Sequence, residues 1–192
     1  MSNLIKVVGI DPSLRNFGFA HAVIDIETFE INITHLELTQ PPSIEKALKK
    51  VVRKNSDDLR RARCLTADLR KATAEAKLAI VEIPVGSQSA RAMASYGICV
   101  GVLASCDIPI IEVTPSEVKL AAVGTKTASK VEMIEWAMAL HPEANWKMRK
   151  SKGVMVPTND NEHLADAIAA IYAGAVTEQF SMAASMMKAM AA

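Results

Sequence analysis

Two carboxylates in this sequence each stand at the end of a largely apolar, β-branched run. Asp11 follows the run at residues 5–10 and precedes Pro12, and Glu82 closes the run at 78–81. Such runs predict buried strands, where a carboxylate costs free energy unless a metal ion, a helix N-terminus or a hydroxyl group compensates its charge. An aspartate that caps the next turn is the alternative for Asp11. Two core strands that each end in one acid favour a functional pair.

A third group of candidate ligands stands at the predicted start of a helix near the C-terminus. The apolar residues there follow helical spacing, and Asn161 or Asp160 could cap the helix. On this helix His163 and Asp166 share one face, while Glu162 and Asp166 form a competing pair on nearly the same side. One histidine and three or four carboxylates could therefore converge from two strands and a helix start. Oxygen ligands of this kind suit magnesium or manganese better than zinc.

Three segments of the sequence resemble the acidic signatures of the RuvC family, whose members are Holliday junction resolvases with an RNase H-like fold. They are Gly9-Ile10-Asp11-Pro12, Val81-Glu82 and His163-Leu164-Ala165-Asp166-Ala167. Between them, residues 112–119 and 123–130 also match, as a strand, a Val-Lys helix and a Val-Gly turn that leads to a second lysine. The resemblance covers about residues 5 to 175, and it is specific because four motifs follow in the family's order.

This resemblance implies a structure-specific endodeoxyribonuclease that resolves four-way DNA junctions by paired, symmetric nicks, leaving 5′-phosphate and 3′-hydroxyl ends. It implies two Mg²⁺ ions about 4 Å apart, one activating water and one stabilising the leaving oxygen, and Mn²⁺ is expected to substitute. Asp11 would bridge the two ions, Glu82 would bind one and Asp166 the other. His163 would be a further ligand or lie beside the attacking water.

The sequence departs from the family's pattern at two positions. Many members carry an acid where this chain has His163 and others carry a histidine; capping of the helix start is the alternative role for this residue. A protonated imidazole cannot bind a metal ion. If His163 is a ligand, activity is therefore expected to fall as the pH is lowered and the ring is protonated. Val85 stands where members often carry an aromatic residue thought to stack at the centre of the junction. Tyr96, Trp146 or Phe17 could supply that contact instead.

Basic residues provide the predicted DNA contacts, although the net charge of the chain is only +1. Lys119 and Lys130 match the family's two lysines near the scissile phosphate. A second set, with no acid inside it, consists of Lys147, Arg149, Lys150 and Lys152. We expect the segment 141–159 to be a loop that is mobile without DNA and closes over the junction backbone. The basic residues between 46 and 63 are either a further phosphate-binding patch or a solvated helix face.

Two symmetric nicks need two active sites related by a twofold axis, so the resemblance implies a homodimer. Gly97 and Gly101 give the helix expected at 89–105 a small-residue face, which suits either a second copy or close approach to the chain's own sheet. With 192 residues, 50% of them hydrophobic, one domain with a sizeable core is expected. We place the nuclease domain at 1–180 and a short Met- and Ala-rich tail at 181–192.

The remaining sequence features predict a soluble protein of the cytoplasm. Three cysteines without CxxC spacing are expected to be free thiols in a reducing compartment. Lys6 and Asp11 interrupt the N-terminal apolar run, so no signal peptide is expected. Asp107 and Pro109 interrupt the apolar run at 98–113, so no contact with a membrane is expected either.

The predicted elements form an α/β fold, a mixed five-stranded sheet with helices on both faces, in the order typical of the RNase H-like fold. Strands are expected at about 4–10, 17–25, 30–38, 78–83 and 108–113. Helices are expected at about 44–77, with a break near 55–57 left open, and at about 89–105, 115–122, 127–140 and 162–180.

Three other functions stay open on the sequence. An RNase H-fold nuclease that acts on flaps, forks or RNA–DNA hybrids would use the same metal site on another substrate. An actin-like ATPase also begins with Gly-Ile-Asp, but that fold needs a duplicated domain and no second glycine-rich phosphate loop is found in the sequence. A non-catalytic junction-binding protein would not need competent ligands at all four metal positions.

Overall fold

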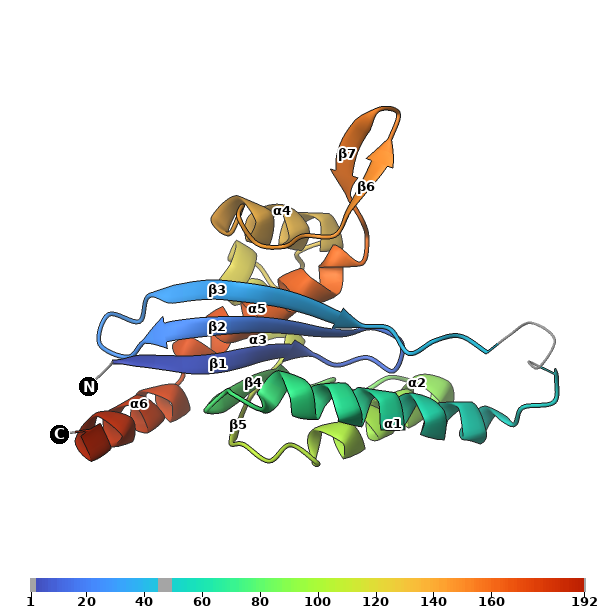
Figure 1. Cartoon of the computed structure of the whole chain (residues 1–192), viewed down its shortest axis with the longest axis horizontal. Coiled ribbons are helices and arrows are strands. Elements are labelled where there is room, and N and C mark those ends of the chain that lie inside the picture. The colour runs from blue at the N-terminus through green and yellow to red at the C-terminus, as the bar shows by residue number, and fades with distance from the viewer. Residues whose placement is uncertain (1–2, 45–49, 192) are drawn as a thin grey trace.

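The computed structural model of the chain describes residues 3–44 and 50–191, and its centre is a five-stranded sheet in the order β3-β2-β1-β4-β5 (Figure 1). The strands are β1 (Leu4–Asp11), β2 (Phe17–Asp25), β3 (Ile31–Thr39), β4 (Leu78–Glu82) and β5 (Ile110–Val113). β1 pairs antiparallel with β2 and parallel with β4, β2 pairs antiparallel with β3, and β4 pairs parallel with β5. The predicted mixed sheet and its five strands are confirmed.

Helices cover both faces of the sheet, as predicted (Figure 1). They are α1 (Lys54–Thr73) and α2 (Ala90–Leu103) on one face, and α5 (Asn161–Ala175), α3 (Pro115–Val123) and α4 (Lys130–Leu140) on the other. Alternation along β1 accounts for the two cores, because successive side chains of a strand point to opposite faces. Val7 joins the core under α5, whereas Val8 and Ile10 join the core under α1 and α2.

The same alternation brings the two strand-end carboxylates together. β1 and β4 are parallel neighbours and Ile10 pairs with Val81, so Asp11 and Glu82 follow at the same edge of the sheet. Asp11 has the parity of Val7 and Glu82 has the parity of Ile80, which places both carboxylates on the face that α5 covers.

Two glycines let α5 lie unusually close to the sheet over this edge. A Cβ atom on Gly9 of β1 would lie 2.1 Å from the backbone oxygen of Ala167, and one on Gly18 of β2 would lie 2.3 Å from that of His163. Gly18 is paired with Asp11 across the β1–β2 ladder. Because Gly9 and Gly18 have no Cβ atom, the first turns of α5 can pack directly against the strand end that carries Asp11.

The helix boundaries differ from the prediction at two places. α1 begins at Lys54, at the break left open near residue 55, and residues 45–49 of the longer helix predicted from residue 44 lie outside the described residues. The single helix predicted at 162–180 is instead two, α5 and α6 (Glu178–Ala191). Thr177 separates them, because its hydroxyl donates to the Gly174 carbonyl and accepts from the Phe180 backbone N–H.

α6 continues through the segment predicted to be a tail. Phe180 and Ala184 are buried in the core under α5, and Met187 packs against that core. The domain boundary placed at residue 180 therefore falls inside a helix. Within the described part of the chain, no helix combines the length and apolar character needed to cross a bilayer.

The segment predicted as a loop at 141–159 contains a β-hairpin, so the loop prediction is wrong for residues 148–157. Its strands are β6 (Met148–Ser151) and β7 (Val154–Pro157), which pair antiparallel. The turn is Lys152-Gly153, with φ values of 49° and 87°. Positive φ at both central residues produces the twist that two-residue hairpins require, and Gly153 adopts it without a steric cost.

Candidate active site

The core of the candidate site is a contact between the end of β1 and the first turn of α5. The Nδ1 atom of His163 lies 2.6 Å from Oδ2 of Asp11, and both side chains are largely buried. The Nε2 atom of the same ring lies 3.4 Å from Oε1 of Glu162. The structure thus brings together residues that are separated by 152 positions in the chain.

Asn16 and Gln40 determine the tautomer and the orientation of the neutral His163 ring. Gln40 Nε2 donates to Asn16 Oδ1 at 3.1 Å, which turns the Asn16 amide nitrogen toward His163 Nε2 at 3.0 Å. Because an amide nitrogen can only donate, Nε2 of the neutral ring accepts and the ring proton sits on Nδ1, where it is donated to Asp11. This chain of hydrogen bonds assigns both the tautomer of His163 and its orientation.

The surroundings of His163 favour its charged form. Burial lowers the pKa of the imidazole, but the hydrogen bond and negative charge of Asp11, with smaller contributions from Glu162 and Asp166, outweigh burial and raise the pKa above its ordinary value. A doubly protonated ring cannot accept from Asn16, so its Nε2–H would point to Glu162 instead.

Glu82 and Asp166 complete a buried acidic cluster. Burial, followed by repulsion from Asp11 and Asp166, raises the pKa of Glu82 to about 8. Burial, followed by repulsion from Asp11, raises the pKa of Asp166 to about 7. Lys119 of α3 opposes both shifts with its positive charge. Full ionisation of the cluster would therefore leave more negative charge than its neighbouring side chains neutralise.

The donor set fits a divalent cation in type and charge. Carboxylate oxygens with uncompensated charge are the ligands that Mg²⁺ and Mn²⁺ prefer. As the side chains stand, no three His, Cys, Asp or Glu residues of the described chain are grouped so that they could hold a metal ion. In this arrangement His163 Nδ1 lies within hydrogen-bond distance of Asp11 Oδ2.

The structure divides the predicted DNA-contacting residues into three groups. Lys119 lies close enough to the acidic cluster to affect its charge state. Lys130 Nζ lies 2.8 Å from Oε2 of Glu162, and Lys147 Nζ lies 3.8 Å from Oδ2 of Asp160, so both lysines border the first turn of α5. The others, Arg149, Lys150 and Lys152, lie on the exposed hairpin.

The basic segment that precedes and begins α1 is partly neutralised. Arg60 and Arg61 pair with Asp57 at 2.7 and 3.0 Å, and Arg91 of α2 forms two hydrogen bonds with Asp58. These pairs support the interpretation as a helix face for this part of the segment. Lys46 and Lys49 lie outside the described residues.

The four residues considered for base stacking have different surroundings in the structure. Val85 is 75% exposed beyond β4. Phe17 is fully buried against Phe19 and is excluded. Trp146 is partly buried and donates its indole N–H to the His141 carbonyl. Tyr96 lines a cavity of about 530 Å³ that also reaches His163, so it is the candidate with access to the site.

The two glycines of α2 do not pack on the chain's own sheet. A Cβ atom at Gly97 or Gly101 would meet no heavy atom within 4 Å. The interpretation that these glycines let α2 approach its own sheet is therefore wrong, and this face of α2 is open.

Sequence reasoning missed Asn16 and Gln40 as parts of the site, and it treated Glu162 only as a competitor for Asp166. Polar residues in a turn and at a strand end carry no periodic pattern, so their contact with His163 emerges only from the fold. The signal that existed was the position of Asn16, five residues after Asp11 on the connection to β2. The contact of Lys130 with Glu162 likewise depends on how α4 and α5 pack.

Comparison with known proteins supports the fold. No protein-family model matches the sequence, and a search of curated proteins finds no match either. Among solved structures, RuvC of T. thermophilus in complex with Holliday junction substrate aligns with a TM-score of 0.62 at 18% identity, over 94% of this chain and 97% of that one. A second Thermus thermophilus RuvC structure aligns with a TM-score of 0.59 at 20% identity, over 88% and 92%. The chain thus shares the RNase H-like fold of RuvC along nearly its whole length.

Proposed function

We propose that this protein is a metal-dependent endodeoxyribonuclease that resolves four-way DNA junctions. The observation that carries the proposal is the buried cluster of Asp11, Glu82 and Asp166, whose charges repel one another at the edge of a RuvC-like sheet. Retaining such charges in a core costs stability, so their presence points to a catalytic use.

Asp11, Glu82 and Asp166 would hold the metal ions, Mg²⁺ or in its place Mn²⁺, with His163 as a further ligand or beside the attacking water. Two divalent ions bound there would activate water and stabilise the leaving 3′ oxygen. His163 holds its proton at Nδ1 and fixes Asp11 Oδ2. Lys119 would contact the scissile phosphate and offset its charge.

The DNA backbone would be held by lysines around the first turn of α5 and by the hairpin. Lys130 and Lys147 border that turn, and Arg149, Lys150 and Lys152 extend the basic surface away from it. These residues would contact phosphates of the junction, so their loss should weaken binding and reduce its dependence on salt.

Paired nicks would come from a homodimer formed through α2. The open face with Gly97 and Gly101 is flanked by Met93 and Val100, which are 47% and 46% exposed. Small residues beside exposed apolar ones allow two helices to approach closely and bury apolar surface. Two copies related by a twofold axis would then each cut one strand.

The test is cleavage of a synthetic four-way junction in Mg²⁺, beside linear duplex, a flap and an RNA–DNA hybrid, by wild type and Asp11→Asn. Paired symmetric nicks in the junction alone, lost in the variant while binding persists, are the expected result. Equal cutting of the other substrates would instead indicate a broader RNase H-fold nuclease. No cutting by wild type, with junction binding intact, would indicate a non-catalytic binding protein.

A further inference from the structure

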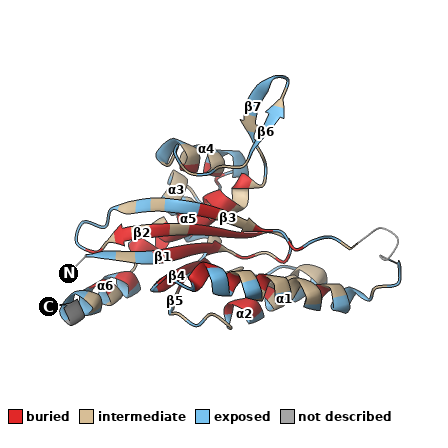
Figure 2. Cartoon of the chain, viewed as in Figure 1, coloured by how far each residue is buried: buried red, intermediate tan, exposed pale blue. Residues whose placement is uncertain are grey.

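The β6–β7 hairpin projects from the body of the protein with both faces in solvent (Figures 1 and 2). Its register pairs Arg149 with Val156 and Lys150 with Met155. Because paired residues of an antiparallel ladder share a face, each face carries one basic side chain beside apolar ones. Val154 and Met155 are 64% and 56% exposed. An isolated two-stranded ribbon is marginally stable in water, so these exposed apolar groups favour a ribbon that a partner covers.

The positive charge of the hairpin indicates that this partner is a polyanion. Four basic residues, and no acidic one, lie between Glu143 and Asp160. They are Lys147, Arg149, Lys150 and Lys152. A ribbon of this charge is repelled by an identical ribbon on a second copy, and it is attracted to phosphates.

The base of the hairpin is held rigidly against the catalytic helix. The side chain of Asn161, fully buried at the start of α5, accepts from the backbone N–H of Lys147 at 3.0 Å and donates to its carbonyl at 2.9 Å. Thr158 N–H donates to the same carbonyl at 3.0 Å. These bonds attach the base of the hairpin two residues before His163 on α5.

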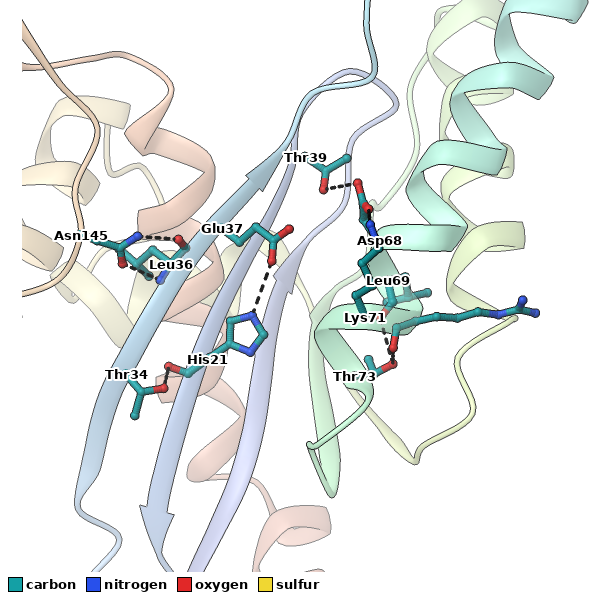
Figure 3. A network of polar contacts seen from close by, with 11 residues as sticks. His21, Thr34, Leu36, Glu37, Thr39, Asp68, Leu69, Lys71, Thr73 and Asn145 are labelled. Atoms are coloured by element: carbon teal, nitrogen blue, oxygen red, sulfur yellow. Dashed lines mark hydrogen bonds and ion pairs between the residues drawn. The ribbon is translucent and has the colours of Figure 1, made fainter.

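A second amide anchors the segment before the hairpin. Asn145 accepts from the N–H of Leu36 and donates to its carbonyl, both at 2.8 Å, on the free edge of β3 (Figure 3). With both amides in place, the segment from α4 to α5 is tied to the sheet and to the catalytic helix. The base of the ribbon is thus held in place before DNA arrives.

We propose that the hairpin enters the major groove of the duplex arm next to the scissile phosphate; this inference rests on the proposed function. A two-stranded ribbon fits the major groove, which is about 12 Å wide and about 8.5 Å deep. Strands of four residues extend about 13 Å, enough to reach the groove floor. There, Arg149 and Lys150 face base edges or flanking phosphates, and Val154 and Met155 meet apolar groups such as thymine methyls.

The turn of the hairpin argues for groove entry over insertion between bases. Side chains that wedge between base steps are apolar at their leading end, whereas the leading residues here are Lys152 and Gly153. A charged apex is compatible with phosphates on the groove walls.

The test measures binding and groove protection in the Asp11→Asn background, which we expect to bind without cutting. Dimethyl sulfate modifies N7 of guanine, an atom in the major groove. The background protein should protect guanines in the arms of a synthetic junction. Adding Arg149→Gln and Lys150→Gln should abolish that protection and raise the Kd about tenfold. The charge-matched control is Arg70→Gln, in the last turn of α1, with Lys77→Gln, just before β4; both sites are exposed, and the control should change neither quantity.

Protection that survives the hairpin substitutions overturns the proposal, as does hairpin-dependent unstacking of 2-aminopurine at the crossover without guanine protection. A change in oligomeric state caused by the hairpin substitutions also overturns it, since the ribbon would then bind a second copy. The same protection assay on linear duplex separates the two proposals. If linear duplex shows hairpin-dependent protection and the wild type does not cleave junctions, the proposed resolvase function would be refuted. The proposal that the hairpin enters the major groove would stand.

Discussion

The acidic cluster and the basic hairpin both lie near the start of α5. Each gathers side chains of like charge, but those of the cluster are buried and those of the hairpin are exposed to solvent. In the cluster, burial removes water from Glu82 and Asp166, and this desolvation, together with repulsion from neighbouring carboxylates, raises both pKa values. On the hairpin, Arg149 and Lys150 stand in solvent, where water and salt screen repulsion. The cluster therefore costs folding free energy and the hairpin costs little. The charges that destabilise the fold are the ones we assign to chemistry.

The largest expected effect comes from neutralising the cluster. Glu82→Gln should reduce cleavage about a thousandfold, because a metal-binding oxygen is lost. The same change should raise the Tm measured in EDTA by about 2–4 °C, the shift that corresponds to about 1 kcal/mol in a chain of this length. Asp166→Asn should behave alike. Single-turnover cleavage and thermal unfolding of both variants measure these effects. A Tm in EDTA below that of the wild type would contradict the conclusion that the buried carboxylates destabilise the fold.

A smaller loss of activity is expected from the residue that orients His163. Asn16→Ala removes the donor to Nε2 and should lower kcat about tenfold with little change in KM. The ¹⁵N chemical shifts of the His163 imidazole should show a smaller population of the Nδ1–H tautomer in the variant. Asn32→Ala, on an exposed position of β3, is the control and should change neither quantity.

Stability of the metal-free protein should depend on pH. The pKa of Glu82 is raised to about 8 in the folded state, so this group stays protonated on folding while the unfolded chain ionises it near its ordinary value. Stability is then lost as pH rises from about 4.5 to 8, and the raised pKa values of Asp166 and His163 act in the same direction. Tm in EDTA should fall across this range, and Mg²⁺ should restore it most at pH 8. A Tm that rises between pH 5 and 8 would contradict the charge assignment.

The smallest effect should come from the hairpin. Arg149→Gln with Lys150→Gln should change the free energy of unfolding by less than about 0.5 kcal/mol, since both side chains are exposed. Thermal unfolding in the presence and absence of salt measures this. A clear rise in stability at low salt would show that hairpin repulsion is not screened, and the contrast with the cluster would fail.

The sequence predicted the cluster better than the hairpin, and the reason is physical. Asp11 and Glu82 end strands whose buried residues have a strong apolar pattern, and parallel neighbours must end at the same edge. Asp166 follows from helical spacing on α5. Burial thus fixes these positions through patterns that span many residues.

The hairpin and the hydrogen bonds of His163 depend on single residues instead. Lys152-Gly153 is a weaker turn signal than Asn-Gly, and Pro142, Gly153 and Pro157 together resemble a loop. The anchoring of Lys147 by Asn161 and the orientation of His163 by Asn16 each rest on one side-chain amide. Such contacts leave no periodic trace in a sequence, so only the folded chain places them.

The close packing of α5 on β1 has a consequence for the time at which the protein gains activity. Asp11 and Glu82 belong to the first half of the chain, but His163 and Asp166 lie near its end, on the helix that packs against Gly9 and Gly18. A ribosome adds about 5–20 residues per second, so the acidic strands exist for seconds before their partners from α5 are made. During that interval the nascent chain holds an incomplete ligand set. On the proposed function, the protein would therefore be inactive until α5, its penultimate helix, has packed on the sheet.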